Sequence, residues 1–215
     1  MGGRTKERPR GDREEFKRLV AAYSGAADRA QKERARSSIW DRFGVSGAAF
    51  ISDMANFSAT SRTQGICHCL KLIHRMREIV AAAIAANDGT LLKYDADNCF
   101  AFFDNTDDAI QTSFDISAEL LRTNRGLPPA DHVSLSVGID HGKLLLIGTE
   151  DYFGDPVNTA SKLGEDLGGG GDILVTERAI AMSSYSADDG VERGVACISE
   201  IEIRFLRLSG AAAQP

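Results

Sequence analysis

Apolar positions along the chain recur at two spacings, and these spacings predict an alternation of helices and strands. Apolar residues three or four positions apart predict helices at residues 12–41, 64–87, 108–124, 155–167 and 176–182. Alternating or continuous apolar residues predict strands at residues 48–52, two within 89–103, and then at 132–140, 143–148, 172–175 and 195–208. Glycines predict the breaks, at Gly25 within the first helix, before the first strand at residues 44–47, and at Gly142 between two strands.

The order of these elements indicates a fold class. It reads strand, helix, strand, strand, helix, strand, and then continues with further strands and helices. The βαββαβ order is typical of the ferredoxin-like sandwich, in which antiparallel strands carry helices on one face. We therefore predict an α+β fold with a C-terminal α/β extension. In this fold the first and third strands lie side by side at the centre of the sheet.

The helix predicted at residues 64–87 contains two cysteines and two histidines close together. Cys67 and Cys69 point in different directions on a helix, and neither forms a compact ligand set with His74. The spacing therefore favours packing in the core over a metal site. The face of this helix that tracks the apolar spacing is predicted to contain Ile66, Leu70, Ile73, either Met76 or Arg77, Val80 and Ile84.

Composition limits the class of protein. A hydrophobic content of 43% in 215 residues is ample for a core. No run of about 18 apolar residues occurs, so no membrane span is expected. The charged N-terminus does not resemble a signal peptide, and four scattered cysteines do not form a disulfide framework, which favours a cytoplasmic location. We expect a helical, partly disordered segment at 1–44, a catalytic domain at 45–209 and a disordered tail at 210–215.

Charge is distributed unevenly between the two parts of the chain. Residues 1–44 contain 12 Lys and Arg against 7 Asp and Glu, whereas residues 45–215 contain 13 against 24. The basic residues of the first part are mixed with acidic ones, which favours a solvated helix over a nucleic-acid contact. The acidic second part suits cations better than polyanions, and no nucleic-acid partner is expected.

The stretch at residues 89–103 places charge at the entrance of an apolar strand. Lys93, Asp95 and Asp97 precede the mostly apolar residues 99–103. Charge is costly to bury without partners, so the stretch is either a solvated hairpin tip or part of a site. Asp53 ends the first predicted strand and Asp97 opens the third, so the two carboxylates are expected to lie close together. Paired carboxylates suit Mg²⁺, which keeps substrate phosphates as further ligands, and main-chain N–H groups after Asp53 could bind phosphate oxygens.

Three segments in order resemble the class III nucleotidyl cyclases, the family of most adenylyl and guanylyl cyclases. They are FISDMANFS at residues 50–58, KYDAD at residues 93–97 and DYFGDPVNTASK at residues 151–162. The third segment is the longest and most specific of the three. The resemblance extends over about residues 45–208. It implies the catalytic domain of an adenylyl cyclase, which works as a head-to-tail dimer with its active sites in the interface.

The resemblance also implies roles for individual residues. Asp53, Met54 and Asp97 of one subunit would hold two Mg²⁺ or Mn²⁺ ions, and Lys93 and Asp151 of the other subunit would recognise adenine. Asn158 would orient the ribose, and Lys162 stands at the position of a transition-state arginine. Asn56, Phe57 and Ser58 would contact the substrate. The reaction would convert ATP to 3′,5′-cyclic AMP and pyrophosphate, in a homodimer because one chain carries both residue sets.

The chain departs from the family pattern at four places. The family's arginine is Lys162 here, and two family glycines are Ala96 and Asn56. The family's Lys-Gly pair near residues 195–208 has no good match, and Arg193-Gly194 is the nearest candidate. These departures raise an alternative function, a catalytically weak cyclase-like domain that binds ATP or a partner in a regulatory role.

Each site residue also has a structural alternative. Asp53 could cap a helix, Asp151 could lie in a turn, and Lys93 could be a surface residue of a strand.

Overall fold

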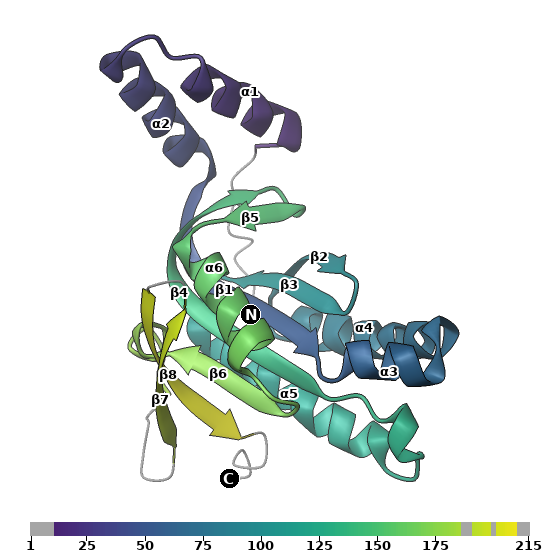
Figure 1. Ribbon diagram of the computed structural model, residues 1–215. Coiled ribbons are helices and arrows are strands. Elements are labelled where there is room, and N and C mark those ends of the chain that lie inside the picture. The colour runs from purple at the N-terminus through teal and green to yellow at the C-terminus, as the bar shows by residue number, and fades with distance from the viewer. Residues whose placement is uncertain (1–10, 186–190, 199–200, 210–215) are drawn as a thin grey trace, which may run out of the picture.

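One sheet of eight strands runs through the body of the protein, and helices cover both of its faces (Figure 1). The computed structural model describes residues 11–185, 191–198 and 201–209. Along the sheet the strands follow the order β2-β3-β1-β4-β6-β8-β7, and β5 pairs with β4. The strands are β1 (Gly44–Met54), β2 (Thr90–Asp95), β3 (Asn98–Phe103), β4 (Leu135–Ile147), β5 (Asp151–Phe153), β6 (Asp172–Thr176), β7 (Glu192–Ile198) and β8 (Ile201–Ser209).

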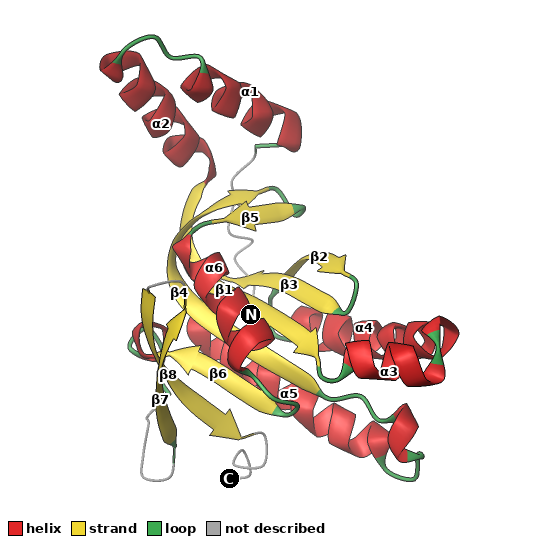
Figure 2. Cartoon of the chain, in the orientation of Figure 1, coloured by secondary structure: helices red, strands yellow, loops and turns green. Residues whose placement is uncertain are grey.

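Helices connect these strands and also precede them (Figure 2). The α-helices are α1 (Arg13–Ser24), α2 (Arg29–Phe43), α3 (Phe57–Gln64), α4 (Ile66–Ala86), α5 (Thr106–Asn124), α6 (Asp155–Ser161) and α7 (Glu177–Ile180). A short 3₁₀ turn, η1, covers Pro129–Asp131, and a π-helical segment, η2 (Lys162–Leu167), continues α6. None of the helices in these described ranges is long and apolar enough to cross a lipid bilayer.

The predicted α+β fold is confirmed. Strands β1 to β4 and the helices between them follow the βαββαβ order, and β1 lies between β3 and β4, antiparallel to both. The sheet is mostly antiparallel, with a parallel pairing between β4 and β6. Strands β7 and β8 extend it beyond β6 as an antiparallel pair.

The main core lies between the sheet and the pair of helices α4 and α5. Fully buried side chains of the strands, including Phe50 and Phe103, pack there with Met76 and Val80 of α4. The buried face of α4 differs from the prediction, because Ile66 and Leu70 are 58% and 55% exposed. The first turns of α4 are buried through Cys69, Leu72 and Ile73, whereas Cys67 is exposed. The apolar spacing predicted the helix correctly. At its N-terminal end, however, the side chains that are buried in the structure lie on a different face from the predicted one.

The opposite face of the sheet carries α6 and η2 (Figure 1). Two glycines allow this helix to approach the strands closely. A Cβ at Gly138 of β4 would lie 2.0 Å from the carbonyl oxygen of Ala160, and one at Gly164 would lie 3.1 Å from that of Ile51. Any larger residue at Gly138 would therefore push the helix away from β4, together with the polar residues that it carries.

Two predicted boundaries were wrong, and one strand was not predicted. Gly142 does not form a turn: β4 continues through it, because Gly142 pairs with Gly47 and its missing side chain makes room for Pro156 of α6. Strand β1 begins at Gly44 rather than Ala48, and β5 was not predicted. The break predicted at Gly25 is confirmed, and it divides the helix predicted at residues 12–41 into α1 and α2.

The division of that helix has a local cause. Gly25 ends α1, and the side chain of Asp28 accepts a hydrogen bond of 2.7 Å from the N–H of Gln31 to begin α2. The resulting hairpin of α1 and α2 projects from the body next to β5 (Figures 1 and 2). The tail predicted at residues 210–215, and residues 1–10 of the N-terminal segment, lie outside the described residues.

Candidate active site

Asp53 and Asp97 lie close together where the end of β1 meets the start of β3. Asp53 is near the end of β1, and Asp97 is in the turn between β2 and β3. Strands β1 and β3 pair antiparallel, with Ser52 opposite Cys99, so the end of one strand meets the start of the other. The two carboxyl groups lie close enough for each to affect the pKa of the other. Burial, and then the charge of Asp97, raise the pKa of Asp53 to about 6, and burial also raises the pKa of Asp97.

This carboxyl pair fits a hard divalent cation. Two partly buried carboxyl groups that lie this close repel when both are charged, and a divalent cation would relieve this repulsion; oxygen ligands suit Mg²⁺ and Mn²⁺. Met54 is only 4% exposed and its side chain packs in the core, so only its main chain could face a metal ion. In the described ranges no group of three or more His, Cys, Asp or Glu side chains is arranged to hold a metal ion. Any ion held by Asp53 and Asp97 would therefore need further ligands from a substrate or water.

Glu165 is a residue of this region that the sequence analysis missed. It lies in η2, accepts a hydrogen bond of 2.7 Å from the hydroxyl of Ser161, and lies 3.4 Å from the amide nitrogen of Asn98. Its charge contributes to the raised pKa of Asp53. The sequence placed Glu165 in the helix predicted at residues 155–167, and helical spacing alone gave no reason to assign it a role. Its proximity to Asp53 arises only because η2 lies across β1.

Lys93 and Asp151 form an ion pair within one chain. The ammonium nitrogen of Lys93, on β2, lies 2.8 Å from Oδ1 of Asp151, the first residue of β5. The Asp151 side chain is only 14% exposed, whereas that of Lys93 is 41% exposed and lies 5.0 Å from the ring centre of Phe100. The structure thus brings together two residues that are 58 positions apart in the chain.

Asn158 and Lys162 line a hollow of about 370 Å³ beside α6 and η2. Asn158 lies in α6, and Lys162 begins the π-helical segment, a type of helical irregularity that is frequent at functional sites. The hollow is lined by Asp155, Asn158, Thr159, Ser161, Lys162, Glu165, Asp166 and Ile203. Glu165, which lines this hollow, lies 3.4 Å from the amide nitrogen of Asn98, the residue after Asp97, so the hollow adjoins the carboxyl pair.

A clamp of charged residues holds the start of α6. The guanidinium of Arg178 lies 2.6 Å from Oδ2 of Asp155, and its Nε donates a hydrogen bond of 2.6 Å to Oδ1 of Asp140. Asp140 is fully buried, so its charge depends on this partner. The clamp raises the pKa of Arg178, chiefly through the hydrogen bond to Asp140. It ties α6, and with it Asn158, to β4.

The segment after Asp53 forms the start of a helix. Helix α3 begins at Phe57 with Asn56 at its N-cap position, so the N–H groups of its first turn have no acceptor within the helix. Phe57 packs against the core. The alternative in which Asp53 caps this helix is wrong, because Asn56 occupies that position.

The other structural alternatives have mixed outcomes. Asp151 is the first residue of β5, not a turn residue, although its Oδ1 also accepts a hydrogen bond of 2.9 Å from the N–H of Tyr152. Lys93 is an exposed residue of β2, which agrees with the alternative that it is a surface residue of a strand. It also forms an ion pair with Asp151. Arg193, the nearest candidate for a phosphate-binding residue, lies in β7 and is 3.4 Å from Glu177.

The two departures at family glycines keep a left-handed backbone. Asn56 has a φ of 62° and Ala96 a φ of 49°, values that glycine adopts without strain. The carbonyl oxygen of Ala96 accepts a hydrogen bond of 2.8 Å from Arg77. The backbone around Asp53 and Asp97 therefore has a glycine-like course in spite of the side chains.

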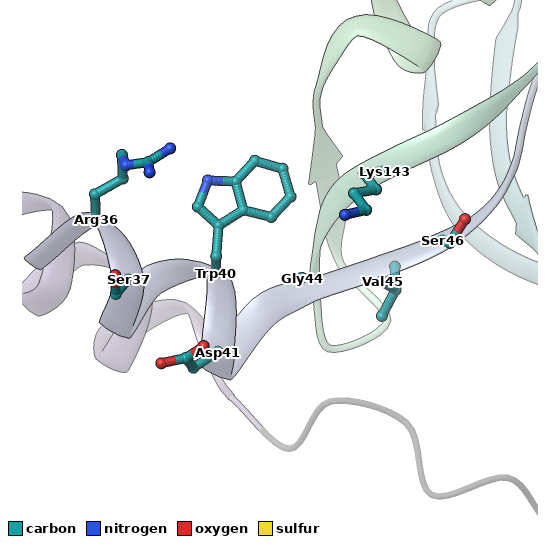
Figure 3. A pocket seen from close by; sticks show the side chains of 8 residues that line it. All are labelled: Arg36, Ser37, Trp40, Asp41, Gly44, Val45, Ser46 and Lys143. Atoms are coloured by element: carbon teal, nitrogen blue, oxygen red, sulfur yellow. The ribbon is translucent and has the colours of Figure 1, made fainter. Parts of the chain in front are cut away.

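A further hollow, of about 610 Å³, lies where α2 meets β1 and β4 (Figure 3). Trp40 and Arg36 of α2 project on the same side of the chain as Lys143 of β4 (Figure 3). None of the residues lining this hollow belongs to the predicted site. The site assembled from the sequence motifs is thus distinct from this hollow.

Comparison with known proteins supports the fold assignment. No protein-family profile matches the chain. A curated protein of Rhizobium meliloti (strain 1021), "Putative adenylate cyclase 3", is 24% identical over 131 residues, which are 60% of this chain and 22% of that protein. The chain therefore spans less than a quarter of the length of this curated relative.

Solved structures of cyclases are similar over most of the chain. A bacterial light-regulated adenylyl cyclase has a TM-score of 0.66 at 22% identity, covering 78% of this chain and 53% of its own. An adenylate/guanylate cyclase/hydrolase from Silicibacter pomeroyi has a TM-score of 0.64 at 25% identity, covering 76% and 96%. The protein thus has the fold of class III adenylyl and guanylyl cyclase catalytic domains, and the resemblance predicted from its motifs is confirmed.

Proposed function

We propose that this chain is an adenylyl cyclase catalytic domain that converts ATP to 3′,5′-cyclic AMP and pyrophosphate. The observation that carries the proposal is the Lys93–Asp151 pair, at 2.8 Å, in a chain that also pairs Asp53 with Asp97. Similarity to cyclases supports a nucleotide cyclase in general. The choice of adenine over guanine rests on the Lys93–Asp151 pair.

Base recognition follows from the donors and acceptors of the pair. The Lys93 ammonium group donates hydrogen bonds only, and the Asp151 carboxylate accepts them only. Adenine offers a matching acceptor at N1 and a donor at its N6 amine, whereas guanine presents the opposite pattern at these positions. The half-exposed lysine can turn from Asp151 toward a base while the carboxylate stays in place.

Asp53 and Asp97 would hold the metal ions, with Met54 contributing through its main chain. Two divalent ions bound there would supply activation of the ribose 3′-hydroxyl and neutralisation of triphosphate charge. The 3′-oxygen forms a bond to the α-phosphorus as the bond from that phosphorus to the pyrophosphate oxygen breaks, and the hydroxyl proton is lost. The N–H groups at Phe57 and Ser58, after Asn56, would bind phosphate oxygens as helix N-termini do.

Asn158 and Lys162 complete the set from the hollow beside α6. Asn158 would orient the ribose by hydrogen bonds, and Lys162 would place positive charge near the α-phosphoryl group. We propose that two copies of the chain form a head-to-tail homodimer, in which the Asp53–Asp97 pair of one subunit and the Lys93–Asp151 pair of the other share a nucleotide. One chain carries both pairs, so a second kind of subunit is not required.

Incubation of the purified protein with ATP or GTP, in the presence of Mg²⁺ or Mn²⁺, tests the proposal. We expect cyclic AMP and pyrophosphate from ATP, with a higher kcat/KM than for GTP, and no product from Asp53→Ala. Product formation can be measured by chromatography and mass spectrometry. Absence of any cyclic nucleotide from the wild type would contradict the proposal.

A second candidate function is a catalytically weak cyclase-like domain that binds ATP or a partner. Lys162 favours it, because lysine is a point charge that lacks the bidentate fork of the family's arginine. Loss of a transition-state donor commonly costs about 10²–10³ in rate. Binding of ATP, measured by calorimetry, without cyclic AMP formation would favour this candidate.

A further inference from the structure

Strand β5, which carries Asp151, has little main-chain support. It is three residues long and, among the described strands, pairs with β4 only. A two-stranded ribbon of this length is marginally stable by itself. Packing of side chains on the two faces of β5 therefore determines where the Asp151 carboxylate lies.

The two faces of β5 are held by different parts of the chain. Tyr152 points into the body, is 3% exposed, and its hydroxyl donates a hydrogen bond of 3.2 Å to the carbonyl oxygen of Phe50. Successive residues of a strand point to opposite faces, so Asp151 and Phe153 share the other face. What covers Phe153 therefore also packs on the face that presents Asp151.

That cover comes from the first helix of the chain. The ring of Phe16, in α1, stacks on the ring of Phe153, with centroids 5.7 Å apart and planes 3° apart. The same ring meets Phe43 edge to face, with centroids 5.2 Å apart. Phe43 is fully buried and is the last residue of α2, directly before β1. Phe16 thus joins α1, β5 and the start of β1.

An ion pair holds α1 in this position. Nε of Arg42, in α2, lies 2.9 Å and 3.0 Å from the two carboxylate oxygens of Glu15, the neighbour of Phe16. The two side chains are 37% and 28% exposed. The ion pair joins α1 to α2 beside Phe16, so the stack of Phe16 on Phe153 is not an isolated contact of α1.

We propose that Phe16 is a positioning residue for base recognition, acting through Phe153 on the strand that carries Asp151. The inference rests on the proposed function, in which Asp151 and Lys93 read the base. While α1 is docked, β5 keeps the carboxylate of Asp151 beside Lys93. Lifting α1 from β5 releases the outer face of the strand and loosens this pair. The N-terminal hairpin is thereby a specificity element of this site.

Hydrogen–deuterium exchange on the full chain tests the hold of α1 on β5 without depending on activity. Truncation in Phe16→Ala removes the ring pair, and we expect exchange of the amides at residues 149–154 to become about 3-fold faster or more. Tyr23→Ala is the matched control, because Tyr23 is an aromatic residue of α1 whose ring contacts Lys32 of α2 instead of β5. Unchanged exchange at residues 149–154 in Phe16→Ala would overturn the inference.

Steady-state kinetics test the consequence for specificity. We expect Phe16→Ala and Phe153→Ala each to raise KM for ATP about 3-fold, lower the ATP-to-GTP ratio of kcat/KM, and leave kcat nearly unchanged. The double variant should be no worse than Phe16→Ala, because Phe16→Ala already removes the contact that Phe153→Ala removes. Phe153 is 47% exposed, so Phe153→Ala is a test that does not depend on the folding of α1.

The possible outcomes separate the inference from the function on which it rests. Faster exchange with an unchanged nucleotide ratio would overturn the link between the position of β5 and specificity. A wild-type protein that forms no cyclic nucleotide would overturn the proposed function and with it the role of Phe16 in specificity. Recovery of the wild-type ratio in Phe16→Leu, which keeps an apolar side chain against Phe153, would support a packing role.

Discussion

At the scale of single residues, Ala96 and Asn56 show how the chain tolerates side chains at two positions where the family resemblance implies glycine. Both keep a positive φ, of 49° and 62°, beside the carboxylates Asp97 and Asp53. A left-handed backbone costs about 1–2 kcal/mol for most residues, but less for asparagine, whose short polar side chain tolerates it. The site therefore retains its backbone course at an energetic cost that falls mainly on Ala96.

This cost predicts a stabilising substitution. Ala96→Gly should increase the free energy of unfolding by about 1 kcal/mol, because glycine removes the strain at this turn. Asn56→Gly is the matched control and should change stability less. Urea unfolding of both variants measures the difference. A destabilised Ala96→Gly protein would show that the φ of Ala96 is not strained.

Lys162 is the residue at which a single change is expected to alter turnover. If it occupies the position of the transition-state arginine, it supplies charge through one contact only. Lys162→Arg should then raise kcat by about 10-fold, or about 1.4 kcal/mol of barrier, with little change in KM. Lys162→Ala should lower kcat. Steady-state kinetics with Mg²⁺ and then with Mn²⁺ measure both variants.

Two other results would change the interpretation of Lys162. No activity in the wild type or either variant would favour the catalytically weak domain. A neutral or harmful Lys162→Arg change, in an active enzyme, would mean that the hollow beside α6 suits lysine better than arginine, and that the departure is an adaptation of this chain.

At the scale of elements, His141 connects three of them. It lies in β4, with Nδ1 3.1 Å from the hydroxyl of Thr106 at the start of α5 and Nε2 3.4 Å from the hydroxyl of Ser46 in β1. Burial lowers the pKa of His141, and Arg178 lowers it further, while Asp140 opposes both. The folded protein therefore binds a proton at His141 less readily than the unfolded chain does.

This difference predicts the direction of a pH effect on stability. The contribution of His141 is complete above the unfolded pKa of about 6.5 and is lost as the pH falls through that value toward the lower folded pKa. His141→Gln should therefore weaken the loss of stability between about pH 7 and pH 5. Urea unfolding at several pH values measures this slope. His74→Gln, at a histidine whose side chain is 78% exposed, is the control and should leave the slope unchanged.

A slope that is equal in the wild type and in His141→Gln would show that other groups control the acid sensitivity.

At the scale of the whole molecule, the proposed homodimer predicts that two inactive variants can restore activity when their subunits combine. Asp53→Ala and Lys93→Ala should each be inactive, because each removes one half of every site. In a mixture, a heterodimer would have one site with both lesions and one site with neither. Mixing the two inactive variants should therefore recover up to about a quarter of wild-type activity if subunits exchange freely, since half of the dimers are mixed and each has one intact site of two.

Cyclic AMP formation in the mixture measures this recovery. Two copies of the same variant, mixed after separate labelling, provide the control for subunit exchange. Failure to recover activity, when mixed dimers are shown to form, would contradict a site shared between subunits and would place both residue pairs in one chain's site.

The amino-acid sequence by itself determined the element order, the fold class and the three groups of candidate residues. These depend on spacing along the chain: apolar periodicity predicts elements, and motif residues close in sequence stay close in space. The order predicted β1 next to β3, so the meeting of Asp53 and Asp97 was foreseeable once the fold class was known. The base-reading roles of Lys93 and Asp151 came from the family resemblance alone.

The tertiary structure decided what depends on contacts between distant segments. Gly142 was predicted to break a strand, but it continues β4 because Gly47 pairs with it and Pro156 lies where its side chain would be. Glu165 comes near Asp53 only because η2 packs on β1, and Phe16 meets Phe153 only because α1 lies against β5. The spacing of residues along the chain carries no information on such contacts, because they form between segments that are far apart in the sequence and come together only in the folded protein.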